Sequence, residues 1–209
     1  MTDLDILIPF SAATTDAELE ACLRGIAANT PVISFEVTLV VIPGPGERMR
    51  GLDDFKALTE RAAPDLSWTV IEYGFEGITR NVMEGIKAVR ASYVAVVPPT
   101  HAIDDPAWFG KLQMPFQRTP QCGLAFAADA ADLRGTGAQP FLWAASSGPG
   151  RVVLSPRDTM VAIANVARLF DYPESLIWAA KSLGLVTYAI PGVRIDIANE
   201  PAHARPGQK

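Results

Sequence analysis

The stretch Gly74–Trp108 reads GFEGITRNVMEGIKAVRASYVAVVPPTHAIDDPAW and decides the predicted fold. Apolar side chains recur at helical spacing from Ile78 to Ala91, so this part is predicted to be a helix. The short apolar strand Tyr93–Val97 follows and runs directly into Pro98-Pro99-Thr100. In an α/β enzyme the carboxyl end of such a strand carries the charged side chains of the site. This sequence therefore combines an enzyme-like scaffold with a strand end that has no carboxylate.

The same alternation of strands and helices extends back to the N-terminus. Thr15 and Glu18 have capping-box spacing, which predicts the start of a helix that ends near Asn29. Four strands with intervening helices predict an α/β fold, a mainly parallel mixed sheet flanked by helices with right-handed crossovers. The strands are predicted at 4–10, 35–42, 68–73 and 93–97, and the later helices at 52–62 and 78–91.

The second half alternates less regularly. Ser155 is expected to cap a helix with Pro156 in its first turn, and that helix runs to about Phe170. Residues 129–150 are rich in Gly, Ala, Ser and Pro, and no element is predicted there. One domain is predicted over 1–199, followed by a polar tail at 200–209. Further helices are predicted at 106–116 and 173–183, and further strands at 122–128, 152–154, 185–190 and 193–197.

Composition limits the function classes. The chain has 209 residues, 49% of them hydrophobic, so it can bury a sizeable core. It carries 18 basic and 23 acidic residues without a basic block, which argues against nucleic acid. No apolar run approaches the roughly 20 residues of a membrane helix, and the acidic N-terminus is not a signal peptide, so no membrane role and a cytoplasmic location are expected. Cys22 and Cys122 are expected to be reduced and buried rather than paired.

The order of these elements resembles that of the family-2 glycosyltransferases, whose nucleotide-sugar-binding fold is called GT-A. The resemblance covers nearly the whole chain. It implies that a nucleotide sugar is a potential partner, held by Pro9, Ser11, Arg80, Asn81, Thr100 and His101. The segments that carry the resemblance are Leu7–Phe10, Leu19–Ile26, Phe35–Ile42, Gly77–Asn81 with Gly85-Ile86, Tyr93–Val97, Ile103–Trp108 and Gly184–Pro191.

The chain departs from this family at three places where its members usually carry acids. The place after the second strand, which holds the nucleotide, reads Ile42-Pro43-Gly44. The Asp-x-Asp place, whose carboxylates bind a divalent cation, reads Pro98-Pro99-Thr100. The place of the general base falls near Tyr172-Pro173, and Glu174 lies one position further on.

Each remaining candidate has a functional and a structural interpretation. Glu174 is a candidate catalytic base, or a first-turn carboxylate favoured by the helix dipole. His101 is a candidate metal ligand or base, or a loop histidine without a role. Asp104 and Asp105 could bind metal, or one of them caps the next helix. The cations that could balance a departing diphosphate, or be ordinary surface residues, are Arg80, Arg151 and Arg157.

The combined losses predict a pseudoenzyme: a glycosyltransferase-like protein used as a binding or structural component of an assembly, such as a viral particle. Protein partners or self-association are then expected, and no metal site and no cofactor. The alternative is an active, metal-independent transferase that moves a sugar from a nucleotide sugar to an acceptor hydroxyl with inversion. Glu174 would be its base and Arg80 would face the diphosphate. Mn²⁺ or Mg²⁺ would take part only if acids outside the motif supplied ligands.

Overall fold

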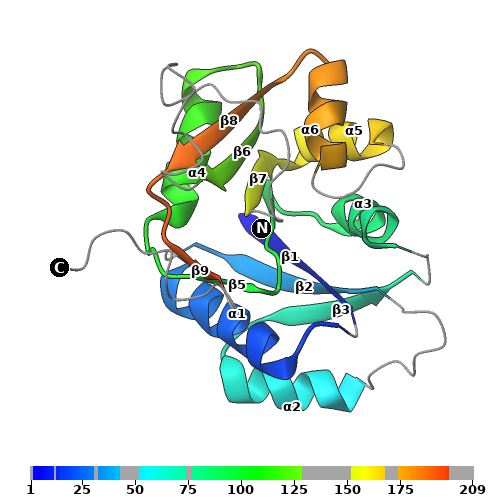
Figure 1. The fold of residues 1–209 in the computed structure, drawn as a ribbon, viewed down its shortest axis with the longest axis vertical. Coiled ribbons are helices and arrows are strands. Elements are labelled where there is room, and N and C mark those ends of the chain that lie inside the picture. The colour runs from blue at the N-terminus through cyan, green and yellow to red at the C-terminus, as the bar shows by residue number, and fades with distance from the viewer. Residues whose placement is uncertain are drawn as a thin grey trace.

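The computed structural model describes residues 2–11, 13–30, 33–42, 52–73, 77–128, 152–167 and 174–197 (Figure 1). The strands are β1 (Leu4–Ser11), β2 (Phe35–Ile42), β3 (Trp68–Glu72), β4 (Tyr93–Val96), β5 (His101–Ile103), β6 (Cys122–Ala128), β7 (Val153–Pro156), β8 (Val186–Pro191) and β9 (Ile195–Ile197). The helices are α1 (Asp16–Asn29), α2 (Leu52–Ala62), α3 (Ile78–Ala88), α4 (Trp108–Arg118), α5 (Arg157–Val166) and α6 (Glu174–Ser182).

Within these ranges the central layer is a sheet in the order β3-β2-β1-β4-β7-β6-β8, and β5 pairs with β9 in a separate two-stranded ribbon. All neighbours in the sheet are parallel except the two pairs that β7 makes with β4 and β6. The predicted α/β class and mainly parallel mixed sheet are therefore confirmed.

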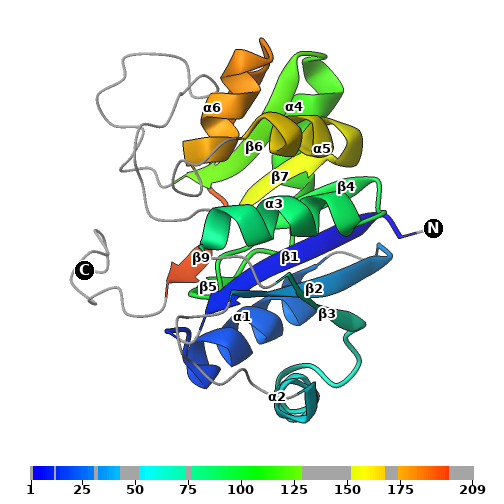
Figure 2. The same cartoon turned by 90° about the vertical axis from the view of Figure 1, so that its right-hand side faces the viewer.

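Helices cover both faces of the sheet (Figure 2). One apolar cluster joins α1, α2 and α4 to one face, and a second joins α3, α5 and α6 to the other. Along β1, Ile6 and Ile8 belong to the first cluster, whereas Leu7 belongs to the second. Side chains alternate in this way along any strand, so a strand covered on both faces must be apolar at nearly every position. That requirement explains the continuous apolar runs of β1 and β2.

Strand direction decides which helix ends share an edge of the sheet. α3 follows β3 and α6 precedes β8, so both helices begin at the edge where the parallel strands end. α5 follows the antiparallel β7 and therefore begins at the opposite, amino edge. The strand order reverses between β1 and β4, and such a switch point is where open α/β sheets bind ligands.

Several predicted boundaries are confirmed by local chemistry. The structure has β2 and α2 at the predicted residues. The predicted capping box is present: Thr15 Oγ1 accepts from the Glu18 backbone N–H at 3.2 Å, and Glu18 Oε2 accepts from the Thr15 N–H at 2.8 Å. Leu19, Cys22, Leu23 and Ile26 are the buried residues of α1, as their spacing predicts.

Two predicted helix ends were wrong, because hydrogen bonds to residues distant in sequence override the local preference. Ser155 does not cap α5, since it lies in β7 and its hydroxyl donates to the Gly123 carbonyl at 2.7 Å. α3 ends at Ala88 rather than at Ala91, because the N–H groups of Arg90 and Ala91 donate to Asp5 Oδ2, each at 2.9 Å.

Some predictions fall beyond what the structure describes. The predicted end of α5 near Phe170, the segment 129–150 and the tail 200–209 lie outside the described residues. Among the described helices, none is long and apolar enough to cross a membrane.

Candidate functional site

The candidate site lies at the carboxyl edge of the sheet, where β1 and β4 end side by side. Pro9 is buried near the end of β1, and the Ser11 backbone N–H donates to Thr14 Oγ1 at 3.3 Å. Beyond β4, the Val97 N–H donates to the Leu7 carbonyl at 2.9 Å, which extends the pairing of the two strands by one residue. The residues after Val97 therefore stand directly beside the end of β1.

Residues 98–101 form a tight turn at this point. The His101 N–H donates to the Pro98 carbonyl at 3.0 Å, and the thiol of Cys22 in α1 lies 3.8 Å from the same oxygen. Val97, Pro98 and His101 are all buried. Pro98 is therefore packed into the fold, and its carbonyl is already bonded there.

His101 was expected in a loop, and that expectation was wrong. It is the first residue of β5, is 5% exposed, and pairs with Ile197 of β9. Its Nδ1 lies 3.0 Å from the Thr100 hydroxyl. The strand was missed because its partner is more than 90 residues away in sequence, and three residues carry too weak a local pattern to reveal it.

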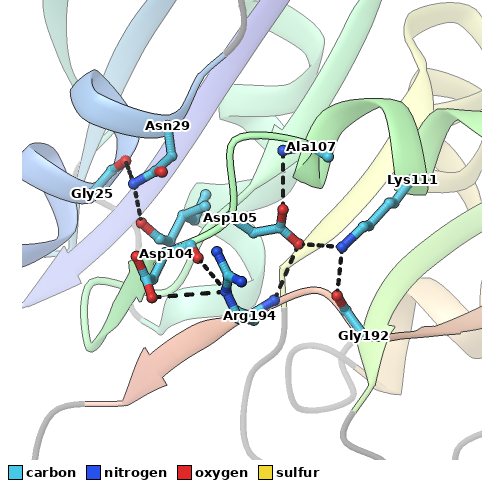
Figure 3. A network of polar contacts seen from close by, with 9 residues as sticks. Gly25, Asn29, Asp104, Asp105, Ala107, Lys111, Gly192 and Arg194 are labelled. Atoms are coloured by element: carbon cyan, nitrogen blue, oxygen red, sulfur yellow. Dashed lines mark hydrogen bonds and ion pairs between the residues drawn. The ribbon is translucent and has the colours of Figure 1, made fainter.

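The Asp105 carboxylate lies near the site, and its hydrogen bonds go to groups of the protein itself (Figure 3). It is 4% exposed, and its Oδ2 lies 2.6 Å from Lys111 Nζ. Its Oδ1 accepts from the Ala107 N–H at 3.0 Å, directly before α4. Burial acts to raise the pKa of Asp105, but the hydrogen bonds and charge of Lys111 and the backbone N–H groups outweigh it and lower the pKa.

Further hydrogen bonds beside Asp105 connect β9 and α1 to the β5 region (Figure 3). Arg194 Nε donates to the Asp104 carbonyl at 2.8 Å, and the Lys111 ammonium donates to the Gly192 carbonyl at 2.7 Å. Asn29 Nδ2 donates to the Ile103 carbonyl at 2.8 Å. The prediction that Asp104 or Asp105 caps the next helix was wrong, because the N-cap residue of α4 is Ala107 and no side chain caps this helix. Lys111, Arg194 and Asn29 carry no motif and were missed.

At the start of α3, the Asn81 side chain is buried and the Arg80 side chain is exposed. Asn81 is completely buried, and its Nδ2 donates to the Gly77 carbonyl at 2.7 Å, so this amide N–H is used inside the fold. Gly77, just before the helix, has φ 84°, a backbone conformation that favours glycine. Arg80 is exposed on the first turn of a helix that begins at the candidate edge.

The remaining charged candidates separate to opposite edges. Glu174 is the first residue of α6 and so stands on the candidate edge. Arg157 begins α5 at the amino edge, where its Nε donates to the Val89 carbonyl at 2.9 Å, so its predicted role beside a diphosphate was wrong. Arg151 lies outside the described residues. The topology thus brings Pro9, Ser11, Arg80, Asn81, Thr100, His101 and Glu174 to one edge, and substrate binding by them stays a prediction.

Comparison with known proteins identifies the fold. Neither a protein-family profile nor a curated protein sequence matches the chain. Solved structures do match. The mannosyltransferase PcManGT from Pyrobaculum calidifontis, in complex with GDP-Man and Mn²⁺, matches with a TM-score of 0.69 and 14% identity over 96% of this chain and 58% of that one. The chain has the GT-A fold. GalNAc-T7 with UDP, GalNAc and Mn²⁺ matches with a TM-score of 0.68 and 9% identity over 98% of this chain.

A third match has a chain closer in length. Glucosyl-3-phosphoglycerate synthase from Mycobacterium tuberculosis, in complex with Mn²⁺, UDP and glucosyl-3-phosphoglycerate, has a TM-score of 0.62 and 13% identity over 96% of this chain and 73% of that one. This chain spans only 45% of the length of GalNAc-T7. The shared GT-A architecture is that of nucleotide-sugar transferases.

These neighbours correct one expectation. The prediction that the protein uses no cofactor was wrong, because all three matched transferases are complexes with Mn²⁺. The described residues nevertheless do not fit a divalent cation, which needs several oxygen ligands. Within the described ranges no group of three or more His, Cys, Asp or Glu is placed to hold one. The residues that follow β4 include Pro98 and Pro99, which have no side-chain ligand, and Asp105 is paired with Lys111.

Proposed function

We propose that this protein is a glycosyltransferase-like protein in which sugar transfer has been lost, and that it acts as a binding or structural component of an assembly. The observation that supports this most directly is the turn at 98–101. Val97, Pro98 and His101 are buried, and the Pro98 carbonyl is engaged by the His101 N–H. A metal-dependent transferase needs carboxylates at this place, and the residues here are Pro98, Pro99, Thr100 and His101, none of which carries one.

The chemistry of transfer makes that change costly. Inverting transfer requires a base for the acceptor hydroxyl and positive charge on the departing diphosphate. Stabilising the charge that develops on the diphosphate lowers the activation free energy of transfer by several kcal/mol. Of the described groups, Asp105 is committed to Lys111, and the Asn81 amide donates within the fold. Arg80 and Glu174 are the charged candidates that remain at this edge.

A donor panel tests the proposal. UDP-, GDP- and dTDP-sugars are each incubated with the protein and with MnCl₂, and released nucleoside diphosphate is measured together with heat of binding. We expect no release above the uncatalysed background for any donor, against turnover of about 1 s⁻¹ or more for ordinary enzymes. Mn²⁺-dependent binding at micromolar concentration together with release of the nucleoside diphosphate would overturn the proposal.

An active transferase is the second candidate, favoured by one observation. α3 and α6 both begin at the carboxyl edge, which sets Arg80 and Glu174 on the same side of the sheet as the β1–β4 switch point. If transfer occurs, Glu174→Gln should reduce turnover by about 10²–10⁴-fold through loss of the base. Asp158→Asn is the matched control, since Asp158 is a first-turn acid of α5 at the other edge. Equal activity of the two variants would exclude Glu174 as the base.

The assembly role has its own measurement. Sedimentation velocity over a wide range of protein concentration should show species larger than the monomer. The purified protein is measured first, and then the same protein mixed with an extract of the cells in which it occurs. A strictly monomeric protein that also fails to bind any partner would contradict a structural role.

A further inference from the structure

A cavity of about 490 Å³ lies at the amino edge of the sheet, away from the candidate site. Its floor is one face of β1, β2 and β3, and its wall is the segment Ala88–Ala91 that follows α3. The polar side chains of its floor are Asp5, Glu36, Thr38 and Thr69. A volume of this size lies within the roughly 300–1,000 Å³ of small-molecule sites.

The cavity exists because α3 is too short to cover this end of the sheet. Leu7 and Val40 belong to the apolar cluster of the α3 face, and both side chains lie against Gly85 of that helix. Asp5 and Thr38 stand two residues earlier on the same strands and hence on the same face. Because α3 ends at Ala88, polar side chains at these positions meet a cavity instead of a helix.

The polar groups of the floor are aligned by strand register. Asp5 lies opposite Glu36, and Thr38 lies opposite Thr69. Thr38 is only 3% exposed, yet its hydroxyl has no hydrogen-bond partner within the described ranges. The hydroxyl oxygen is not one of the fully buried unpartnered atoms of the described residues, so it is reached from the cavity that Thr38 lines. It is therefore open to a hydrogen bond from water or from a ligand donor.

Asp5 offers a second acceptor. It is 4% exposed, and its two backbone hydrogen bonds, from Arg90 and Ala91, both end on Oδ2. Its Oδ1 has no partner among the described residues, and Glu36 forms no ion pair there either. Asp5 therefore has one carboxylate oxygen, Oδ1, that can accept a hydrogen bond from a ligand.

The charge of the cavity selects the kind of ligand. Asp5 and Glu36 are acidic, Arg90 is the basic residue of the lining, and the carbonyl end of α3 adds partial negative charge. Ile71 and Val89 supply apolar surface beside these groups. We propose that this cavity binds a small organic cation, an alkylammonium compound whose N–H groups donate to Asp5, Glu36 and Thr38 and whose methylenes contact Ile71 and Val89.

The test is a titration of the ¹⁵N-labelled full chain with 1,4-diaminobutane, followed at the backbone amides of Arg90 and Ala91. These two N–H groups donate to Asp5 and so report on its carboxylate. We expect saturable shifts with a millimolar or lower Kd, about −4 kcal/mol or better. The uncharged 1,4-butanediol at equal concentration should produce none, and NaCl at equal ionic strength should not reproduce them.

Two variants and one control make the result specific. Thr38→Val keeps the side-chain shape and Glu36→Gln keeps its size, and each should weaken diamine binding at least about fivefold. Glu60→Gln removes an exposed acid from α2 on the opposite face and should leave the Kd unchanged. No saturable shift at tens of millimolar diamine, or an unchanged Kd in both folded variants, overturns the proposal. A guanidinium probe that binds more tightly than the diamine would overturn the assignment to an alkylammonium group.

Discussion

The Lys111 ammonium lies 2.6 Å from the Asp105 carboxylate and 2.7 Å from the Gly192 carbonyl. The pair therefore connects the start of α4 to the turn that precedes β9, and β9 in turn pairs with β5. Asp105 is nearly completely buried, whereas the Lys111 side chain is 37% exposed. This asymmetry makes the carboxylate dependent on its partner, because a buried charge without a counter-ion is strongly unfavourable.

Lys111→Met should lower the free energy of unfolding by about 1–3 kcal/mol, since it keeps the aliphatic stem but leaves the Asp105 charge unpaired. Urea denaturation monitored by circular dichroism measures the change. Lys87→Met is the matched control: Lys87 pairs with Glu84 at 2.8 Å, but both side chains are about one third exposed. That variant should cost less than about 1 kcal/mol. Equal costs for the two variants would show that the Asp105 pair is an ordinary surface contact.

The same pair predicts a pH dependence. The pKa of Asp105 is lowered in the folded protein, so the interaction stabilises the fold above the unfolded-state value of about 3.9. The stabilisation is lost as the pH falls through the lower folded-state pKa, because the protonated carboxyl no longer attracts Lys111. The difference in unfolding free energy between the wild type and Lys111→Met should therefore be largest near neutral pH and shrink below about pH 4. A difference that stays constant down to about pH 2 would contradict this assignment.

The part of the fold that local signals determine could be predicted from the sequence. β2 is a run of β-branched and apolar residues, and α2 is stopped by Pro64, so both were placed to the residue. The end of α3 could not be predicted, because Asp5 captures the N–H groups of Arg90 and Ala91 across 85 or more residues of sequence.

Some features of the candidate site could likewise be predicted from the sequence, and others depend on contacts that the sequence does not reveal. The absence of a carboxylate from Pro98–Thr100 can be read directly from the sequence. The direction of β7 is not, and that direction alone sends Arg157 to the amino edge. The contact of Lys111 with the Gly192 carbonyl joins residues 81 positions apart, so no spacing rule could find it.

Gly25→Ala tests the packing of α1 on β5. A Cβ at Gly25 would lie 2.7 Å from the Ile103 backbone nitrogen and 2.9 Å from its carbonyl oxygen. Backbone cannot yield as a flexible side chain does, so the variant should be destabilised by about 1–3 kcal/mol. The shift should also break the bond from Asn29 Nδ2 to the Ile103 carbonyl, which a changed side-chain amide signal in an NMR spectrum would report.

Gly110→Ala controls for the helix propensity of alanine. A Cβ at Gly110 of α4 would meet nothing within 4 Å, so this variant should be neutral or more stable by up to about 1 kcal/mol. If both alanine variants gained stability, α1 and β5 would have to be further apart than the structure shows.

The buried thiols give the last prediction. Burial raises the pKa of both Cys22 and Cys122 to about 12, so only roughly one part in 10⁴ is thiolate at pH 8. Neither should react with a disulfide reagent such as Ellman's reagent while the protein is folded, and two thiols should react in concentrated urea. Cys22 lies beneath the Pro98 carbonyl, so its protection also reports on the turn at 98–101. Rapid labelling of Cys22 in the folded protein, located by peptide mass mapping, would show that this turn opens, and the support that the buried turn gives to the proposed loss of sugar transfer would then fail.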